Sequence, residues 1–168
     1  CCGCTACEHI CPTKAITMVS DKEGFLYPEI NNDLCIDCRL CNEVCPIQNE
    51  FSGDIRFDKP QVYAIKHKSN KVRMESASGG AYSALSDLFL KESSIVYGVK
   101  FSGEFHVHHD SAKSSKERDE FKGSKYIQSD LKDTFTRIKD DLTEGKNVLF
   151  TGTGFQVAGL INFLDRKK

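Results

Sequence analysis

One cysteine pattern occurs twice, 34 residues apart, and constrains this sequence more than any other feature. Both copies read C-x2-C-x2-C-x3-C-P, a run typical of proteins that hold two 4Fe-4S clusters. Two intervening residues let successive thiolates reach neighbouring irons of one cube, and the proline ends the following helical turn. The first copy is Cys1, Cys4, Cys7 and Cys11-Pro12, and the second is Cys35, Cys38, Cys41 and Cys45-Pro46.

In such runs the fourth cysteine crosses to the other cluster. We therefore expect one cluster to be held by Cys1, Cys4, Cys7 and Cys45, and the other by Cys35, Cys38, Cys41 and Cys11. Zinc is the alternative, because C-x2-C pairs also build tetrahedral zinc sites. Two complete runs with the same spacing favour iron–sulfur clusters over zinc. Cys2, whose counterpart is Ile36, is interpreted as a partly buried neighbour of the cluster and not as a ligand.

A disulfide framework is a poor interpretation of the cysteines. Nine is an odd number, all nine lie in the first 45 residues, and no secretory leader is evident. Between the two runs, apolar residues alternate around the polar stretch 20–24, which predicts a β-hairpin. Residues 1–50 are thus predicted to form an α+β ferredoxin-like dicluster module whose small apolar core depends on its clusters.

Residues 51–60 form a polar segment, which is predicted to be a linker. The spacing of apolar residues changes after it. Strands are expected at 62–66, 95–101, 105–109, 126–127 and 147–150, and helices from about Gly80, from Asp130 and through Leu164. The helix from Gly80 is expected to bury its apolar residues. This alternation predicts an α/β domain over residues 61–168. The chain starts at Cys1 and stops within a helical pattern, so we expect a C-terminally truncated piece of a longer protein.

Charge is distributed unevenly along the chain. Residues 1–50 carry eight acidic against three basic side chains, whereas residues 51–168 carry sixteen against twenty. Neither part has the dense basic stripe of a nucleic-acid binder, and no apolar run suggests a membrane span. We expect a cytoplasmic protein with no nucleic-acid partner.

Two loops of the α/β part have the composition of phosphate-binding turns. Ser76–Gly80 and Thr151–Gly154 each combine hydroxyl side chains with glycines at a helix start. Such residues more often serve only as helix caps. A metal site built from Glu104, His106 and His108 is disfavoured, because nothing nearby in the sequence completes it.

Several segments in this order resemble the coenzyme F420 hydrogenase/dehydrogenase beta-subunit family, over nearly the whole chain. They are CCGCTACEHICP, EGFLYPEI, CIDCRLCNEVCP, SASGG, GSKYIQS and LFTGT-x-x-Q-x-AGL. The resemblance implies that the dicluster module exchanges electrons with a flavin, FAD, bound by the α/β domain. In archaeal members this flavin passes a hydride to coenzyme F420. The substrates of bacterial relatives are less well defined.

The resemblance also implies a set of flavin contacts. These are Ser76, Ser78, Gly79 and Gly80, then Lys125, Tyr126 and Ser129, then Thr151, Gly152 and Gln156. One departure lies in the last segment, where the family usually reads Gly-Thr-Pro-Cys-Gln. Here Phe155 replaces the cysteine, so no thiol is available at that position.

Three functional hypotheses follow from these patterns. The first is an iron–sulfur flavoprotein oxidoreductase subunit that works with a redox partner protein, a hydrogenase or another reductase subunit. The second is a ferredoxin-like electron-transfer subunit without its own flavin or catalysis. The third is a relative that folds around its clusters and carries out no chemistry. Bound flavin distinguishes the first from the other two, and partner-dependent electron transfer distinguishes the second from the third.

Overall fold

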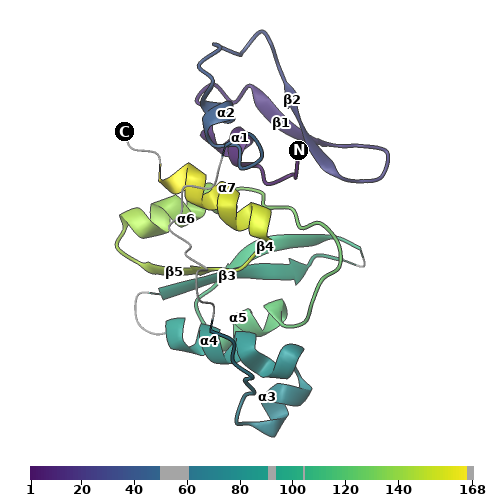
Figure 1. The fold of residues 1–168 in the computed structure, drawn as a ribbon, viewed down its shortest axis with the longest axis vertical. Coiled ribbons are helices and arrows are strands. Elements are labelled where there is room, and N and C mark those ends of the chain that lie inside the picture. The colour runs from purple at the N-terminus through teal and green to yellow at the C-terminus, as the bar shows by residue number, and fades with distance from the viewer. Residues whose placement is uncertain (50–60, 91–93, 104, 166–168) are drawn as a thin grey trace. The chain divides into compact units, whose positions relative to one another are not determined.

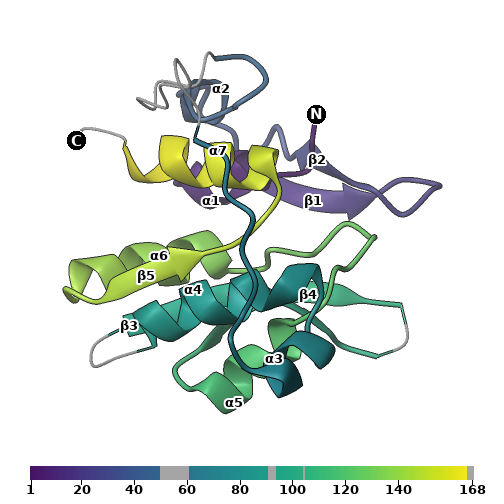
Figure 2. The same cartoon turned by 60° about the horizontal axis from the view of Figure 1, so that its bottom comes forward.

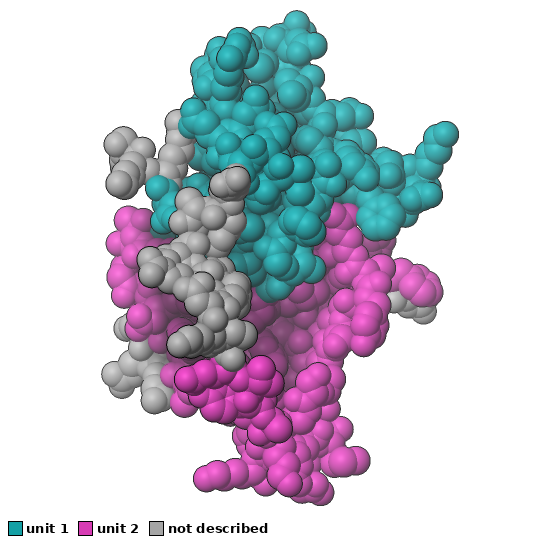
Figure 3. Space-filling model, in the orientation of Figure 1, with its two compact units in different colours: residues 1–53, 135–139, 152–168 teal, residues 54–134, 140–151 magenta. Residues whose placement is uncertain are grey.

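The computed structural model describes residues 1–49, 61–90, 94–103 and 105–165 (Figure 1). The predicted linker and Glu104 lie outside the described residues. The chain forms two compact units, coloured separately in Figure 3. Unit 1 comprises residues 1–53, 135–139 and 152–168, and unit 2 comprises residues 54–134 and 140–151. No described helix has the length and apolar character needed to cross a membrane.

The hairpin predicted between the cysteine runs is present in unit 1. Strands β1 (Ile16–Ser20) and β2 (Leu26–Ile30) pair antiparallel, with Ile16 opposite Ile30. The Asp21 carboxylate fixes the turn, because it accepts hydrogen bonds from the backbone N–H groups of Glu23 and Phe25, both at 2.9 Å. Gly24 supplies the positive φ of 88° that closes this turn.

Three helices complete unit 1: α1 (Ala6–Ile10), α2 (Leu40–Glu43) and α7 (Gly154–Leu164). Helix α1 contacts both of the others. An aromatic group joins these segments, since the ring centroids of His9 and Phe135 lie 5.1 Å apart and those of Phe135 and Phe163 lie 5.9 Å apart. Unit 1 therefore includes two segments that the sequence assigns to the domain 61–168, because their apolar side chains pack against the cysteine-bearing helices.

Unit 2 contains a three-stranded sheet of order β4-β3-β5. Strand β3 (Ser94–Phe101) pairs antiparallel with β4 (Val107–Ala112) and parallel with β5 (Asn147–Phe150). This mixed α/β arrangement confirms the predicted strands 95–101 and 147–150. The predicted strands at 62–66 and 126–127 are wrong. Residues 62–66 are extended but unpaired and mostly exposed, and the only bridge beside 126–127 within the described residues joins His108 to Asp130.

Short helices cover the unit 2 sheet. Helix α4 (Ala81–Phe89) contacts β3 and β5, whereas α5 (Ser115–Arg118) contacts β4. Both helices lie on the same side of the sheet in Figures 1 and 2. The remaining elements are α3 (Asn70–Met74), the 3-10 turns η1 (Ser78–Gly80) and η2 (Asp119–Phe121), and α6 (Thr134–Thr143), which contributes residues to both units.

Helix α4 buries its polar face, contrary to the sequence expectation. Ser83 and Ser86 are buried, whereas Leu85 and Leu88 are exposed. The reason is Arg118, whose side chain is 4% exposed. It donates to the Ser83 carbonyl at 2.9 Å and to the Ser86 hydroxyl, and it pairs with Asp87 and Asp119. A buried guanidinium needs acceptors around it, and this face of α4 supplies them.

We predict that Arg118→Ala lowers the free energy of unfolding by about 2 to 4 kcal/mol, because it leaves buried acceptors without a donor. Lys116→Ala removes the same charge from an exposed position of the same helix and should change stability by less than about 0.5 kcal/mol. Chemical denaturation monitored by circular dichroism measures both effects. Equal losses in the two variants would contradict the role given to Arg118.

Candidate iron–sulfur and flavin site

The cysteine repeat is also a repeat of backbone conformation. Thr5 and Arg39, which are 34 residues apart, both have a φ of 59° and precede helices α1 and α2. Gly3 and Asp37 are likewise left-handed, with φ values of 63° and 49°. A left-handed backbone conformation is unfavourable for most residues other than glycine. It turns successive backbone N–H groups toward a concave side of the loop, which suits a negatively charged group.

The hydrogen bonds of the two runs repeat with the same spacing. The Cys11 N–H donates to the Glu8 carbonyl and the Cys45 N–H to the Asn42 carbonyl, each at 3.3 Å. Each fourth cysteine therefore follows a short helical turn. This places its thiol about one turn away from the preceding three cysteines.

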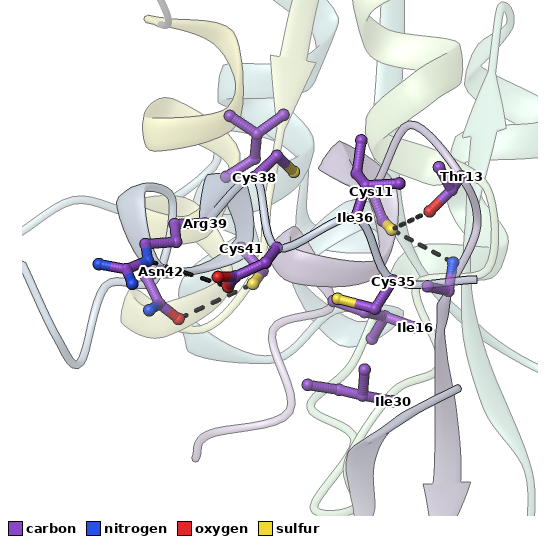
Figure 4. A pocket seen from close by; sticks show the side chains of 13 residues that line it. Cys11, Thr13, Ile16, Ile30, Cys35, Ile36, Cys38, Arg39, Cys41 and Asn42 are labelled. Carbon is purple, nitrogen blue, oxygen red and sulfur yellow. Dashed lines mark hydrogen bonds and ion pairs between the residues drawn. The ribbon is translucent and has the colours of Figure 1, made fainter. Parts of the chain in front are cut away.

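Four of the predicted ligands line one cavity of about 200 Å³ (Figure 4). They are Cys11 from the first run and Cys35, Cys38 and Cys41 from the second. The walls between them are apolar and include Ile16, Ile30 and Ile36. Helix α2 and the loop before it contribute three thiols, and the end of α1 contributes the fourth. This is the grouping that the crossed assignment requires.

The Cys11 sulfur lies beside hydrogen-bond donors. The Ala15 N–H donates to its Sγ at 3.2 Å, and the Thr13 hydroxyl lies 3.7 Å away. Burial alone would raise the pKa of Cys11, but these neighbours outweigh it, so the pKa lies below its usual value. The same interactions stabilise a thiolate, which is the form that binds iron.

The other predicted ligand set is more deeply buried. Burial raises the pKa of Cys4 to about 12 and that of Cys7 to about 11. Cys7 also interacts electrostatically with Cys45, its predicted partner from the second run, and with Cys41. Cys1 is exposed, and its Sγ accepts a hydrogen bond from the Gly3 N–H at 3.4 Å. Iron binding to these thiols must release protons, because the ligating form is the thiolate.

Among the described residues, no three His, Cys, Asp or Glu side chains converge closely enough to hold a single metal ion. A 4Fe-4S cube makes a different demand, since each thiolate binds its own iron and the sulfurs stay apart around the cube. The cavity lined by Cys11, Cys35, Cys38 and Cys41 fits that demand, with N–H donors near sulfur and apolar walls. Cys2 is half-buried and lies next to Cys4, consistent with its predicted place near a cluster.

The first group of predicted flavin contacts forms a tight turn in unit 2. Ser78, Gly79 and Gly80 have successive φ values of 50°, 68° and 76°. Gly80 is essential to this turn, since a Cβ there would lie 3.0 Å from the Cβ of His67. Ser76 does not point into open space, because its hydroxyl lies 3.3 Å from that of Ser83.

The second group lies in the loop after η2. The Lys125 ammonium donates to the Lys122 carbonyl at 2.8 Å and to the Glu120 carbonyl at 3.3 Å, and burial lowers its pKa. Tyr126 is 96% exposed, whereas Ser129 is buried. The Lys125 ammonium therefore already donates to protein carbonyls, and the Tyr126 side chain lies in solvent.

The third group is divided between the units. Thr151, at the end of β5, donates its hydroxyl to the Tyr97 carbonyl at 3.0 Å. Gly152 and Gln156 belong to unit 1. The Gln156 side chain accepts the Thr153 N–H at 2.9 Å in a capping box at the start of α7, so Thr153 of the Thr151–Gly154 loop serves as a helix cap.

Two polar residues near Thr151 were not predicted from the sequence. Burial raises the pKa of Tyr82 to about 12, and the Arg118 and Thr151 side chains offset part of this shift. His109 stacks on Phe150, and its Nε2 lies 3.1 Å from the Thr151 carbonyl. Within the described structure, the Tyr82 hydroxyl and the His109 Nδ1 are buried without a hydrogen-bond partner. The only sequence signal for Tyr82 is its place two residues after Gly80.

Comparison with known proteins addresses the first part of the chain. Residues 1–49 match the 4Fe-4S dicluster domain family. The N-terminal part of this chain is therefore an iron–sulfur ferredoxin module.

Curated relatives are similar over part of their length. A polyferredoxin-like protein of Methanocaldococcus jannaschii is 36% identical over 64 residues, which cover 31% of this chain and 36% of that protein. Formate hydrogenlyase subunit 2 of Escherichia coli is 40% identical over 55 residues, covering 32% and 25%. The B subunit of the anaerobic dimethyl sulfoxide reductase of Haemophilus influenzae is 34% identical over 70 residues, covering 42% and 27%. This chain thus spans about a quarter to just over a third of the length of these relatives.

We predict that Cys11→Ser lowers iron from about eight to about four per chain, because it removes one ligand of one cube. Cys2→Ser should keep about eight, since Cys2 is not a predicted ligand. Iron assay of anaerobically purified protein, with electron paramagnetic resonance after reduction, measures both. Equal iron loss in the two variants would contradict the assignment.

We predict that His109 makes stability pH-dependent. Burial lowers its pKa to about 4 in the folded state, so below its ordinary value of 6.5 the unfolded chain takes up the proton first. Stability is then full above about pH 6.5 and falls as the pH drops toward 4, by about 2 kcal/mol between pH 7 and 5. Urea unfolding measures this slope. His109→Gln should flatten it, whereas His106→Gln, at an exposed position, should not.

Proposed function

We propose that this chain is an electron-transfer subunit in which two 4Fe-4S clusters carry single electrons between a partner protein and an FAD. The observation that carries the proposal is the cavity that Cys11 shares with Cys35, Cys38 and Cys41. A chain with two independent sites would keep the four cysteines of each run together. Sharing of thiols between runs supports two adjacent clusters, which suits electron passage from one to the other.

The chain's own residues set the conditions for that chemistry. Backbone N–H groups at Ala15 and Gly3 donate to sulfur, which stabilises thiolate charge and favours the reduced cluster. The more exposed thiols, Cys35 and Cys38, belong to one site, and the buried Cys4 belongs to the other. The two clusters would therefore have different surroundings and different reduction potentials.

An FAD would be held in the α/β part. The left-handed turn at Ser78–Gly80 precedes α4, and consecutive left-handed residues of this kind can form a concave anion-binding turn. A flavin, when bound, supplies two-electron hydride chemistry. Coenzyme F420 is the candidate substrate by resemblance, and FAD-dependent oxidoreduction is the proposed activity.

The second candidate function is a ferredoxin-like subunit that binds no flavin. Lys125 and Gln156 favour it, because both make hydrogen bonds within the protein. Phe155, 54% exposed, favours it also, since the cysteine usual in the family is missing at this position.

A redox partner protein follows from either function. Two of the similar proteins are named as subunits of formate hydrogenlyase and of dimethyl sulfoxide reductase, both multi-subunit redox complexes. We propose a hydrogenase or another reductase subunit as partner. The acidic balance of residues 1–50 suits a partner with a basic surface. Nine free cysteines suit a reducing compartment, the cytoplasm.

We predict about one FAD per chain, released by acid from anaerobically purified full-length protein, together with about eight irons. Reduction of added coenzyme F420 by the dithionite-reduced protein, followed by absorbance, tests the hydride step. Eight irons without flavin, even after reconstitution with FAD, would leave the ferredoxin-like function as the answer. Absence of iron would exclude both.

A further inference from the structure

Helix α7 passes unusually close to the first cysteine run, and a glycine makes this possible. A Cβ added at Gly159 would lie 3.0 Å from the Sγ and 3.2 Å from the Cβ of Cys4, and 3.5 Å from the Cβ of Ala6. Cys4 is 7% exposed and Ala6 is fully buried, so neither has room to move away. Only a residue without a side chain permits this approach.

The same helix contacts the second run one turn later. The Asn162 amide donates to the Val44 carbonyl at 3.3 Å. Val44 is 1% exposed, ends α2 and directly precedes Cys45. Residues three apart on a helix lie on one face, so Gly159 and Asn162 form a continuous contact. This contact reaches the neighbourhood of both Cys4 and Cys45, which come from different runs.

We infer that α7 is a structural wall of the site formed by Cys1, Cys4, Cys7 and Cys45, with Gly159 and Asn162 as its positioning residues. The inference rests on the proposed iron–sulfur function. Gly159 fixes how closely the helix backbone approaches the Cys4 sulfur. Asn162 fixes the segment from which Cys45 reaches the same cluster. The residues that Gly159 and Asn162 contact, Cys4, Ala6 and Val44, do not line the cavity of Cys11, Cys35, Cys38 and Cys41.

This wall gives the two clusters different dependence on the C-terminal part of the chain. Helix α7 starts at Gly154 and carries Gln156, a predicted flavin contact, three residues before Gly159. A rigid helix therefore joins that position to the Cys4 sulfur. Mutation of residues that surround metal ligands changes metal affinity by about 10- to 100-fold.

The test compares Gly159→Ala with Gly154→Ala, the same substitution at the first residue of the same helix, where a Cβ meets nothing within 4 Å. Iron release from the anaerobic full-length protein to a ferrous chelator is followed by absorbance. In Gly159→Ala, we expect half of the iron to be released about tenfold faster or more, while the other half keeps the wild-type rate. Gly154→Ala should release both halves at the wild-type rates.

A Cys11→Ser background assigns the affected half, because it keeps only the site of Cys1, Cys4, Cys7 and Cys45. Gly159→Ala in that background should accelerate release of all remaining iron. Asn162→Leu, which keeps the side-chain size but removes the donor, provides a second route if Gly159→Ala fails to fold. We expect it to accelerate the same half and to shift the reduction potential of that cluster alone in an EPR-monitored titration.

Several outcomes would overturn the inference while leaving the proposed function intact. Each assumes that the wild type holds about eight irons. One is an unchanged rate of iron release in both Gly159→Ala and Asn162→Leu. The others are equal acceleration of both halves of the iron, or equal effects of Gly159→Ala and Gly154→Ala. A wild-type protein that binds no clusters would overturn the proposed function and the inference together.

Discussion

The structure of unit 1 depends on how its two cysteine runs meet: the fourth cysteine of the first run lies with the second run, and the fourth cysteine of the second run is predicted to bind with the first. Cys11 lines the cavity of the second run, and Cys45 lies near Cys7 of the first. This exchange requires the short helices α1 and α2 to pack side by side, because each ends in the thiol that the other run needs. The left-handed residues before each helix, the hairpin between the runs and the buried Val44 all maintain this arrangement. Without clusters, eight thiols in such a small core would contribute little packing energy.

Unit 2 depends on a different kind of interaction. In addition to the apolar side chains that its sheet buries, a charged side chain organises the adjacent helices. Arg118 draws Ser83 and Ser86 inward, which leaves Leu85 and Leu88 at the surface. A buried charge with several acceptors fixes one arrangement of the helices more specifically than apolar contacts alone, although its net contribution to stability is modest.

Elements with a local signal could be predicted from the sequence. The cysteine repeat predicted the dicluster module, alternation predicted the hairpin, and short apolar runs predicted β3 and β5. Long-range arrangements could not be predicted. The apolar pattern of α4 indicated Leu85 and Leu88 as buried, since nothing local in the sequence reveals that Arg118 packs beneath that helix. Residues 62–66 have strand composition but find no partner strand in the described structure. The flavin candidates came from resemblance, and the structure shows that Gln156 and Lys125 already have protein partners.

The order of segments in unit 1 has a consequence for the synthesis of the chain. Both cysteine runs leave the ribosome before α7, which follows more than 100 residues after the last cysteine. During this interval Cys4 lacks its contact with Gly159, and Val44 lacks the hydrogen bond from Asn162. The contacts of α7 with Cys4 and Val44 are therefore among the last to form as the chain is made. Folding of the first cysteine run is thus completed by a segment made more than 100 residues after it.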